Sequence, residues 1–144
     1  MKLSDLTPYE NNPRIIDEAV PLVAESIKQC GYATPIVVDE NGVILAGHTR
    51  YEALKELGID EVEVVVAKGI TEEQGRKYRI LDNKTGELAT WDRSLLREEI
   101  SELDFGGFDF GQPIDTKAFD QAEEEDGPHQ KTIICPRCNS EVAV

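Results

Sequence analysis

Apolar positions between residues 43 and 58 predict a strand that passes directly into a helix. A short apolar run at residues 43–45 ends at Ala46-Gly47, where a glycine lets the backbone turn without steric conflict. Beyond it, apolar positions recur at helical spacing, and Gly58 stands where a glycine commonly ends a helix. The stripe of this helix consists of Tyr51, Leu54 and Leu57.

A helix and a hairpin are predicted before this unit. The helix extends from about Pro21 to Gly31, and its apolar stripe includes Cys30, whose thiol we expect to be buried and inert. The apolar run at residues 34–39 predicts a strand, and the Asn-Gly turn that follows it is a strong hairpin signal. The proline-containing first fourteen residues predict a short edge strand and then an extended loop.

A third strand and a further helix are predicted after Gly58. The valine-rich run at residues 62–67 predicts the strand, and a capping-box pattern at Thr71 opens the helix. We expect this helix to end after about Leu81, at a polar turn, and to direct Tyr78 and Leu81 toward the core. Together these elements predict a small α+β domain in which helices pack on a mixed sheet.

Three segments organise the chain. A last helix near Asp92 completes the domain, for which we predict the limits 1–104; its buried side is expected to be Leu95, Leu96, Ile100 and Leu103. Residues 105–131 contain glycine-spaced phenylalanines and an acidic run, which is typical of a linker or docking tail. Residues 132–144 form a third segment with a zinc-knuckle-like turn.

The charge balance limits the partners. The 144 residues carry a net charge of −14: −6 before Trp91, and −8 from Trp91 to the end of the sequence. Such acidity is poorly suited to holding nucleic acid by charge, so DNA would be met through a partner or at a local basic patch. No apolar run reaches membrane-spanning length and the first residues lack a signal-peptide core, which predicts a cytoplasmic protein.

The junction at Gly47 has the chemistry of a phosphate site. A helix that begins directly after a glycine presents free N–H groups and a partial positive charge, here at His48 and Thr49. Arg50 adds a full charge in the first turn. The alternative is an ordinary strand–helix connection with a solvent-facing arginine, and the residues alone leave both open.

The turn Cys135-Pro136-Arg137-Cys138 can present two thiolates, from Cys135 and Cys138, to one Zn²⁺ ion. His129 offers a third ligand, so a fourth would come from a second copy of the chain or from a partner. A homodimer that shares the metal is one expectation. A half ribbon without metal is the other.

Several segments in the same order resemble a known family. They are residues 12–14, 24–27, 31–38, 46–53 and 82–83. This order is similar to the N-terminal domain of ParB proteins, and more broadly to the ParB/sulfiredoxin superfamily. The resemblance implies that Gly47 and Arg50 bind a triphosphate, and that Asp82 and Asn83 contribute to phosphate and magnesium binding. It also places Arg14 in the site and Thr34 in the turn that meets the base.

Several residues differ from the ParB pattern, and these differences limit which ligand and which reaction the resemblance implies. His48 and Thr49 replace a glutamate and an arginine, Glu52 replaces a second arginine, and Thr34 replaces a glutamine, so cytosine recognition is not implied. The arginine expected near Gly86 is missing. His48 also stands where sulfiredoxin has its cysteine nucleophile, which excludes sulfinic acid reduction by that mechanism. No helix-turn-helix pattern follows, so the chain resembles the free-standing domains of mobile elements and methylase-associated loci.

Three classes of function follow. The first is a nucleotide-binding module that takes CTP or ATP with Mg²⁺ and acts with a DNA-processing or DNA-modifying partner. The second is an enzyme, either an NTPase, a nuclease or a phosphotransferase. The third is an adaptor that has kept the fold and lost the ligand. A basic patch for DNA would draw on Arg14, Arg50, Arg76, Lys77 and Arg79.

Overall fold

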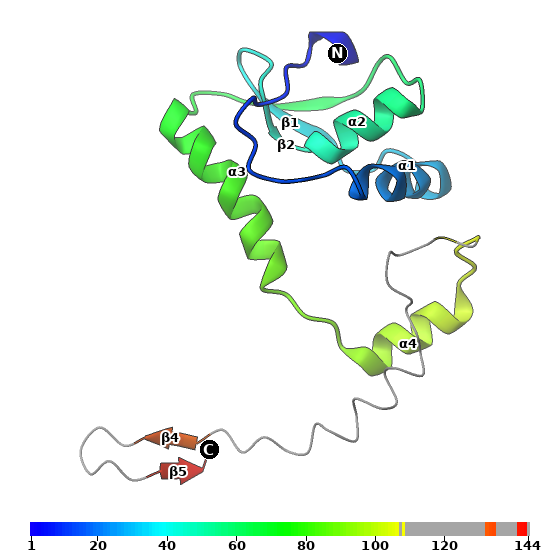
Figure 1. Cartoon of the computed structure of the whole chain (residues 1–144), viewed down its shortest axis with the longest axis vertical. Coiled ribbons are helices and arrows are strands. Elements are labelled where there is room, and N and C mark those ends of the chain that lie inside the picture. Colours follow the sequence, from blue (N-terminus) through cyan, green and yellow to red (C-terminus); the bar gives the residue numbers. More distant parts are fainter. Residues whose placement is uncertain (107, 109–131, 135–140, 144) are drawn as a thin grey trace. The chain divides into compact units, whose positions relative to one another are not determined.

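The computed structural model describes residues 1–106, 108, 132–134 and 141–143 (Figure 1). The chain divides into two units, one formed by Met1–Trp91 with Phe105–Asp109 and one by the remaining residues. The first unit contains η1 (Leu3–Asp5), α1 (Ala19–Cys30), β1 (Ile36–Asp39), β2 (Ile44–Ala46), α2 (His48–Glu56), β3 (Val64–Ala67) and α3 (Glu72–Glu87). The second contains α4 (Arg93–Glu102), β4 (Thr132–Ile134) and β5 (Glu141–Ala143).

The predicted hairpin and mixed sheet are confirmed. Strand order is β2-β1-β3, with β1 antiparallel to β2 and parallel to β3. The hairpin turn is tied by the Asp39 carboxylate, which accepts the backbone N–H groups of Asn41 and Val43, each at 2.9 Å. Because β1 lies between β2 and β3 in the sheet, the chain has to cross β1 to reach β3, and α2 lies in that connection.

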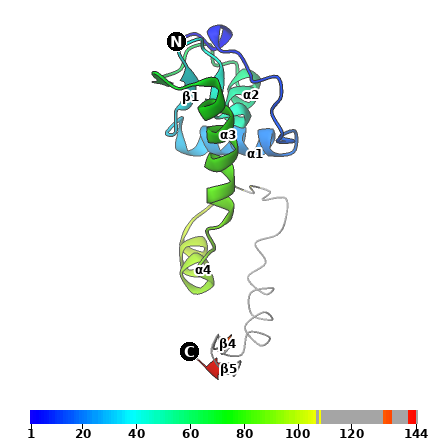
Figure 2. The same ribbon diagram turned by 90° about the vertical axis from the view of Figure 1, so that its left-hand side faces the viewer.

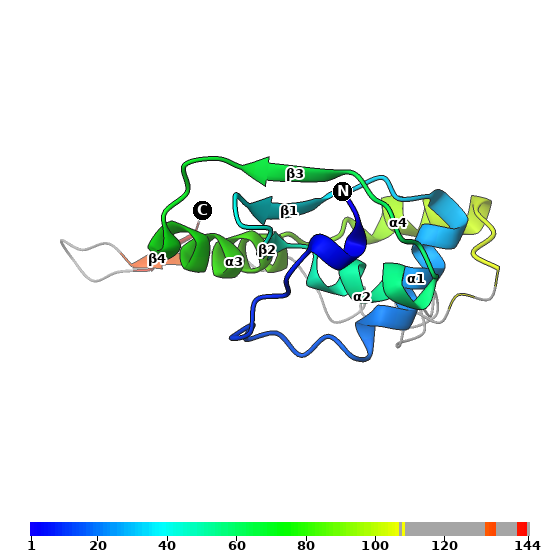
Figure 3. The ribbon, with the colours of Figure 1, turned by 90° about the horizontal axis from the view of Figure 1, so that it is seen from above.

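The core lies between the sheet and two helices. Ile36, Val38, Ile44 and Leu54 are fully buried and form its centre. Helices α1 and α2 lie on one face of the sheet (Figure 3) and pack against each other through small apolar side chains, among them Ala24 of α1 and Ala53 of α2. The N-terminus of α2 is therefore fixed against both the sheet and α1.

The first residues fold differently from the predicted edge strand. Leu3–Asp5 is a short 3-10 helix, flanked by isolated bridges from Lys2 to Glu61 and from Thr7 to Val43. The reason is the spacing of Leu3 and Leu6, which are both buried. A three-residue separation puts two side chains on one side of a 3-10 turn, whereas a strand would send them to opposite faces.

Helix α3 is longer than predicted and continues through the polar run at residues 82–86. Side chains in this run bond to their own helix: Asn83 Nδ2 donates to the Arg79 carbonyl at 2.7 Å, and Thr85 Oγ1 donates to the Leu81 carbonyl at 2.7 Å. The capping box at Thr71 is confirmed. Asp82 and Asn83 therefore stand on a helix rather than in a turn. The last turns of this helix extend past the sheet (Figures 1 and 2).

The buried face of α3 is also different from the prediction. Tyr78 and Leu81 are exposed, whereas Gly75 and Arg79 are buried against β2. Gly75 allows this close approach, because a Cβ at that position would lie 3.2 Å from the Leu45 side chain. Arg79 follows one turn later on the same face.

In the second unit, Asp92 precedes α4, and its carboxylate caps the helix by accepting the N–H groups of Ser94 and Leu95. Leu95 and Leu103 are more than half exposed, so the predicted buried side of this helix is wrong at both. Strands β4 and β5 pair antiparallel. Cys135 and Cys138 lie outside the described residues, so the zinc prediction is untested, as are the predicted domain limits.

Neither a cluster of metal ligands nor a membrane-spanning helix occurs in the described residues. No group of three or more His, Cys, Asp or Glu side chains is placed to hold a metal ion within the part of the chain that the structure describes. None of the described helices is both long enough and apolar enough to span a membrane.

Candidate functional site

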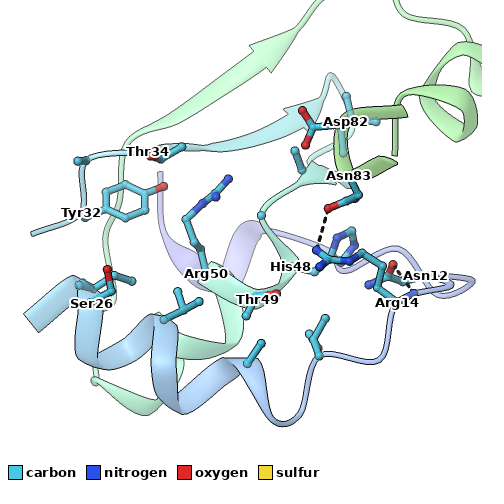
Figure 4. A pocket seen from close by; sticks show the side chains of 18 of the residues that line it. Asn12, Arg14, Ser26, Tyr32, Thr34, His48, Thr49, Arg50, Asp82 and Asn83 are labelled. Carbon is cyan, nitrogen blue, oxygen red and sulfur yellow. Dashed lines mark hydrogen bonds between the residues drawn. The ribbon is translucent and has the colours of Figure 1, made fainter. Parts of the chain in front are cut away.

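A cavity of about 440 Å³ lies in the first unit where α1, the β2–α2 junction and α3 meet (Figure 4). The loop that leads into α1 forms a further wall. All eight residues that the sequence predicted for nucleotide or phosphate binding line this cavity: Arg14, Thr34, Gly47, His48, Thr49, Arg50, Asp82 and Asn83. The fold thus brings together residues that are up to 69 positions apart, as the hydrogen bond between Arg14 and Asn83 shows.

The β2–α2 junction is built around Gly47. This residue precedes the first turn of α2 and has a φ of 106°, in the region that favours glycine. A Cβ there would lie 3.1 Å from Ile36 and 3.0 Å from the Arg50 guanidinium, so the position also needs the missing side chain. The N–H groups of His48 and Thr49 start the helix without partners in the preceding turn, as at any helix N-terminus.

Arg50 is half-buried and does not face solvent, so the solvent-facing alternative is wrong. Its side chain rises from α2 into the cavity toward Thr34 (Figure 4). One terminal amino group donates to the Pro35 carbonyl at 3.3 Å. The Nε–H is buried and has no hydrogen-bond partner among the described residues. A buried donor without an acceptor is costly, and an acceptor on a bound ligand would remove that cost.

His48 is neutral at physiological pH. Burial is the main cause that lowers the pKa of His48 from 6.5 to about 4, and the positive charges of Arg79 and Arg14 lower it further. The Tyr9 backbone N–H donates to Nε2 of His48 at 3.1 Å. Since Nε2 accepts, the single proton of the neutral ring is on Nδ1, and the side chain is a donor rather than a cation.

Asn83 connects the loop before α1 to α3. Arg14 donates to Asn83 Oδ1 at 2.7 Å, and Asn83 Nδ2 donates to the Arg79 carbonyl at 2.7 Å. These two bonds fix which end of the amide faces Arg14. The neighbouring Asp82 is exposed, and its carboxylate is the acidic group of the cavity wall (Figure 4).

Sequence reasoning missed Arg79 as a cavity residue. It is 8% exposed, donates from Nε to the Ile44 carbonyl at 3.0 Å, and its guanidinium carbon lies 3.8 Å from the centre of the Tyr9 ring. The prediction that Tyr78 and Leu81 face the core placed Arg79 on the exposed side of the helix. The four-residue spacing of Gly75, Arg79 and Asn83 was the signal that could have found it, because such residues share one face of a helix.

At the end of α1, the sequence-based prediction was wrong for one cavity residue and missed another. Cys30, predicted to be buried, is exposed and lines the cavity, because the apolar stripe of α1 makes its last core contact at Ile27. Tyr32, in the turn that follows, was not predicted as a site residue. Its hydroxyl accepts the Ile36 N–H at 2.7 Å and donates to the Glu63 carbonyl at 2.8 Å, which holds the turn against the sheet.

The cavity is positive although the chain is acidic. Its charged lining consists of Arg14, Arg50 and Arg79 against one carboxylate, that of Asp82, while His48 is uncharged. Arg50 and Arg79 are at least partly buried, so the surrounding protein screens their charges less than water would and they attract anions more strongly than an exposed arginine such as Arg14. The site is therefore suited to an anionic ligand that carries several hydrogen-bond acceptors.

These features define a small mixed α+β domain with a cation-lined cavity at a strand–glycine–helix junction. Residues 1–84 match the ParB N-terminal domain, and the chain belongs to this family. This confirms the family that the sequence resembles.

Two relatives show the range of the family. The ParB-like nuclease domain-containing protein YnaK of Escherichia coli K12 is 43% identical over 76 residues, which cover 52% of this chain and 87% of that protein. Stage 0 sporulation protein J of Bacillus subtilis is 32% identical over 109 residues, covering 72% of this chain and 34% of that protein. The chain thus spans about a third of this longer relative.

Solved structures confirm the fold. The C-terminally truncated chromosome-partitioning protein ParB from Caulobacter crescentus, complexed with CTP-gamma-S, matches with a TM-score of 0.57 and 22% identity over 69% of this chain and 57% of that one. A Pnob8-like ParB-N domain matches with a TM-score of 0.50 and 14% identity, covering 99% of this chain and 55% of that one.

Proposed function

We propose that this protein is a nucleotide-binding ParB-like module and that its cavity holds a nucleoside triphosphate. The observation that carries the proposal is the unpartnered, buried Nε–H of Arg50 beside the space that Gly47 leaves open. A phosphate oxygen is the acceptor that this donor lacks. The Caulobacter relative of the same fold is a complex with a CTP analogue, which supports the same ligand class here.

Each wall has a role in this proposal. The N–H groups of His48 and Thr49 and the guanidinium of Arg50 hold the phosphates, because a helix start and an arginine fork both present donors to oxygen. Arg14 adds charge from the loop. The turn that contains Thr34 lines the cavity and would meet the base.

The residues also fit a magnesium ion that accompanies the nucleotide. Mg²⁺ usually takes one or two carboxylates and fills its other positions with phosphate oxygens and water, so the single carboxylate of Asp82 is sufficient. Asn83 stands beside Asp82 on α3 and offers an amide for oxygens of the ligand. The ion would neutralise part of the triphosphate charge.

The partners follow from the acidity of the chain. A net charge of −14 disfavours direct binding of duplex DNA, so we propose that the module acts with a DNA-processing or DNA-modifying protein. The YnaK relative is named as a protein that contains a ParB-like nuclease domain. Nuclease activity is therefore the second candidate function. It is tested by incubating the protein with duplex and single-stranded DNA and Mg²⁺.

Calorimetric titration with CTP, ATP and GTP, each with Mg²⁺, tests the proposal. At least one should bind with 1:1 stoichiometry, and inorganic tripolyphosphate should compete with it. The test variant is Arg50→Ala, which removes an arginine of the cavity and should weaken binding. Its matched control is Arg76→Ala, which removes an exposed arginine outside this cavity and should leave binding unchanged. Absence of heat or competition for all three nucleotides at millimolar concentration would leave the adaptor function.

A further inference from the structure

Arg79 is a buried charge without an ionic partner. Its side chain is 8% exposed, and no carboxylate among the described residues lies within ion-pair distance of it. Burial lowers the pKa of the Arg79 guanidinium, yet arginine stays protonated in proteins. A buried, unpaired cation is costly, and burial of this kind commonly indicates a functional site.

The guanidinium is held in one orientation. Nε donates to the Ile44 carbonyl at 3.0 Å, and the Tyr9 ring covers one face at 3.8 Å from its centroid. Gly75, one turn earlier, leaves room for the group, since a Cβ there would lie 3.5 Å from one terminal nitrogen. The two terminal amino groups have no hydrogen-bond partner within the described residues, so the part of the fork that best matches an oxyanion is available.

Arg79 lines the same cavity as Arg50 but reaches it from a different element. Arg50 projects from α2, whereas Arg79 projects from α3. Its charge is felt at the β2–α2 junction, where it helps to lower the pKa of His48. The two arginines can therefore act on the same anion from two walls of the cavity.

We propose that Arg79 is a further phosphate-binding residue of this cavity and that Tyr9 positions it. This inference rests on the proposed function and extends it to a residue outside the Gly47–Arg50 and Asp82-Asn83 motifs. A chain of three phosphates is long and charged enough to be held from both α2 and α3. A single phosphate on the Gly47–Arg50 site leaves Arg79 with little to bind.

Titration of three probes with Mg²⁺, namely CTP, CMP and inorganic tripolyphosphate, separates this role from a structural one. Arg79→Lys keeps the charge but loses the planar fork. We expect it to weaken CTP and tripolyphosphate by about ten-fold and CMP by less than about two-fold, since one charge-assisted contact is lost. Arg76→Lys, on the exposed side of α3, should leave all three affinities unchanged.

Tyr9 provides the second pair of variants, which retain the arginine. Tyr9→Phe keeps the ring and should bind like the wild type, whereas Tyr9→Leu removes the stacked face. We expect Tyr9→Leu to weaken CTP by about three- to five-fold with a smaller change for CMP. If Arg79→Lys does not fold, as melting would reveal, the Tyr9 pair decides the question.

The outcomes separate the two proposals. A wild type that binds none of CTP, ATP, GTP and tripolyphosphate overturns the proposed function and this inference with it. A wild type that binds both, together with an Arg79→Lys variant whose loss is absent or equal for CTP and CMP, overturns this inference alone. A loss confined to the polyphosphate probes supports it.

Discussion

At the start of α2, the Arg50 side chain occupies the space that a Cβ on Gly47 would need. A Cβ on Gly47 would lie 3.0 Å from a terminal nitrogen of Arg50 and 3.2 Å from its Nε. The lack of space for a Cβ is one reason why this position needs glycine. The other is the left-handed backbone at Gly47, with φ of 106°. Backbone conformation and available space therefore restrict position 47 to glycine independently. The absence of a side chain at this position allows Arg50 to adopt its orientation.

Gly47→Ala should destabilise the protein and displace Arg50. We expect a loss of about 1–2 kcal/mol in the free energy of unfolding, because a side chain at positive φ is strained. Nucleotide affinity should fall as the guanidinium moves. The matched control is Gly86→Ala, since Gly86 lies in α3 with nothing within 4 Å of its missing Cβ. Urea unfolding should show Gly86→Ala unchanged or slightly more stable, and equal losses in both variants would contradict the argument.

Arg50→Ala should weaken the nucleotide by about ten-fold to a hundred-fold, which corresponds to roughly 1.5–3 kcal/mol for a charge-assisted hydrogen bond. The half-buried side chain donates to Pro35 at a long 3.3 Å, so only a small loss of stability is expected. Calorimetry and thermal melting of the same sample measure both. A stable variant with unchanged affinity would show that Arg50 does not bind the ligand.

Local signals were sufficient to predict most of the first unit. The Asn-Gly turn predicted the β1–β2 hairpin, and the pattern at Thr71 predicted a capping box that the structure contains. Both signals act within a few residues of the chain, so no knowledge of the fold is needed. The junction at Gly47 belongs to the same class, because the glycine, the helix start and Arg50 are neighbours in sequence.

What the sequence could not predict depends on tertiary packing. Arg79 was assigned to a surface patch because its burial requires α3 to lie against β2, an approach that Gly75 permits and that no local pattern reveals. The hydrogen bond between Arg14 and Asn83 joins two distant segments and has no local signal. Cys30 was assigned to the core because helical spacing alone does not show where the covering elements end.

Cys30 should react with a thiol reagent in the folded protein, since it is exposed, and bound nucleotide should slow the reaction, since it lines the cavity. A variant with Cys135→Ser and Cys138→Ser leaves Cys30 as the sole cysteine. Labelling is then followed with and without CTP and Mg²⁺. Equal rates in the presence of bound nucleotide would place the ligand away from the end of α1.

Duplex DNA should bind weakly and with little sequence preference. The net charge of −14 repels the phosphate backbone, and the cationic side chains of the cavity face a recess rather than an extended surface. An electrophoretic shift assay at physiological salt measures this. A shift at nanomolar protein that persists against competitor DNA would show that the chain alone contains a DNA-binding surface.

His48 should make stability depend on pH below neutrality. Its pKa is about 4 in the folded protein, mainly because of burial, against 6.5 in the unfolded chain, so the unfolded chain binds the proton more readily. The contribution of neutral His48 is complete above pH 6.5, declines as the pH falls toward 4, and changes no further below that. Protonation also ends the bond from Tyr9, because Nε2 then becomes a donor.

Urea unfolding of the wild type and of His48→Gln between pH 7 and pH 4.5 measures this contribution. The pKa difference corresponds to about 3 kcal/mol, and screening of the partly exposed ring should reduce the effect to about 2 kcal/mol or less. Comparing the two proteins at each pH removes the effects of groups that do not interact with residue 48. The stability gap between the wild type and His48→Gln should therefore shrink as the pH falls. A gap that stays constant over this range would mean that the fold does not oppose protonation of His48.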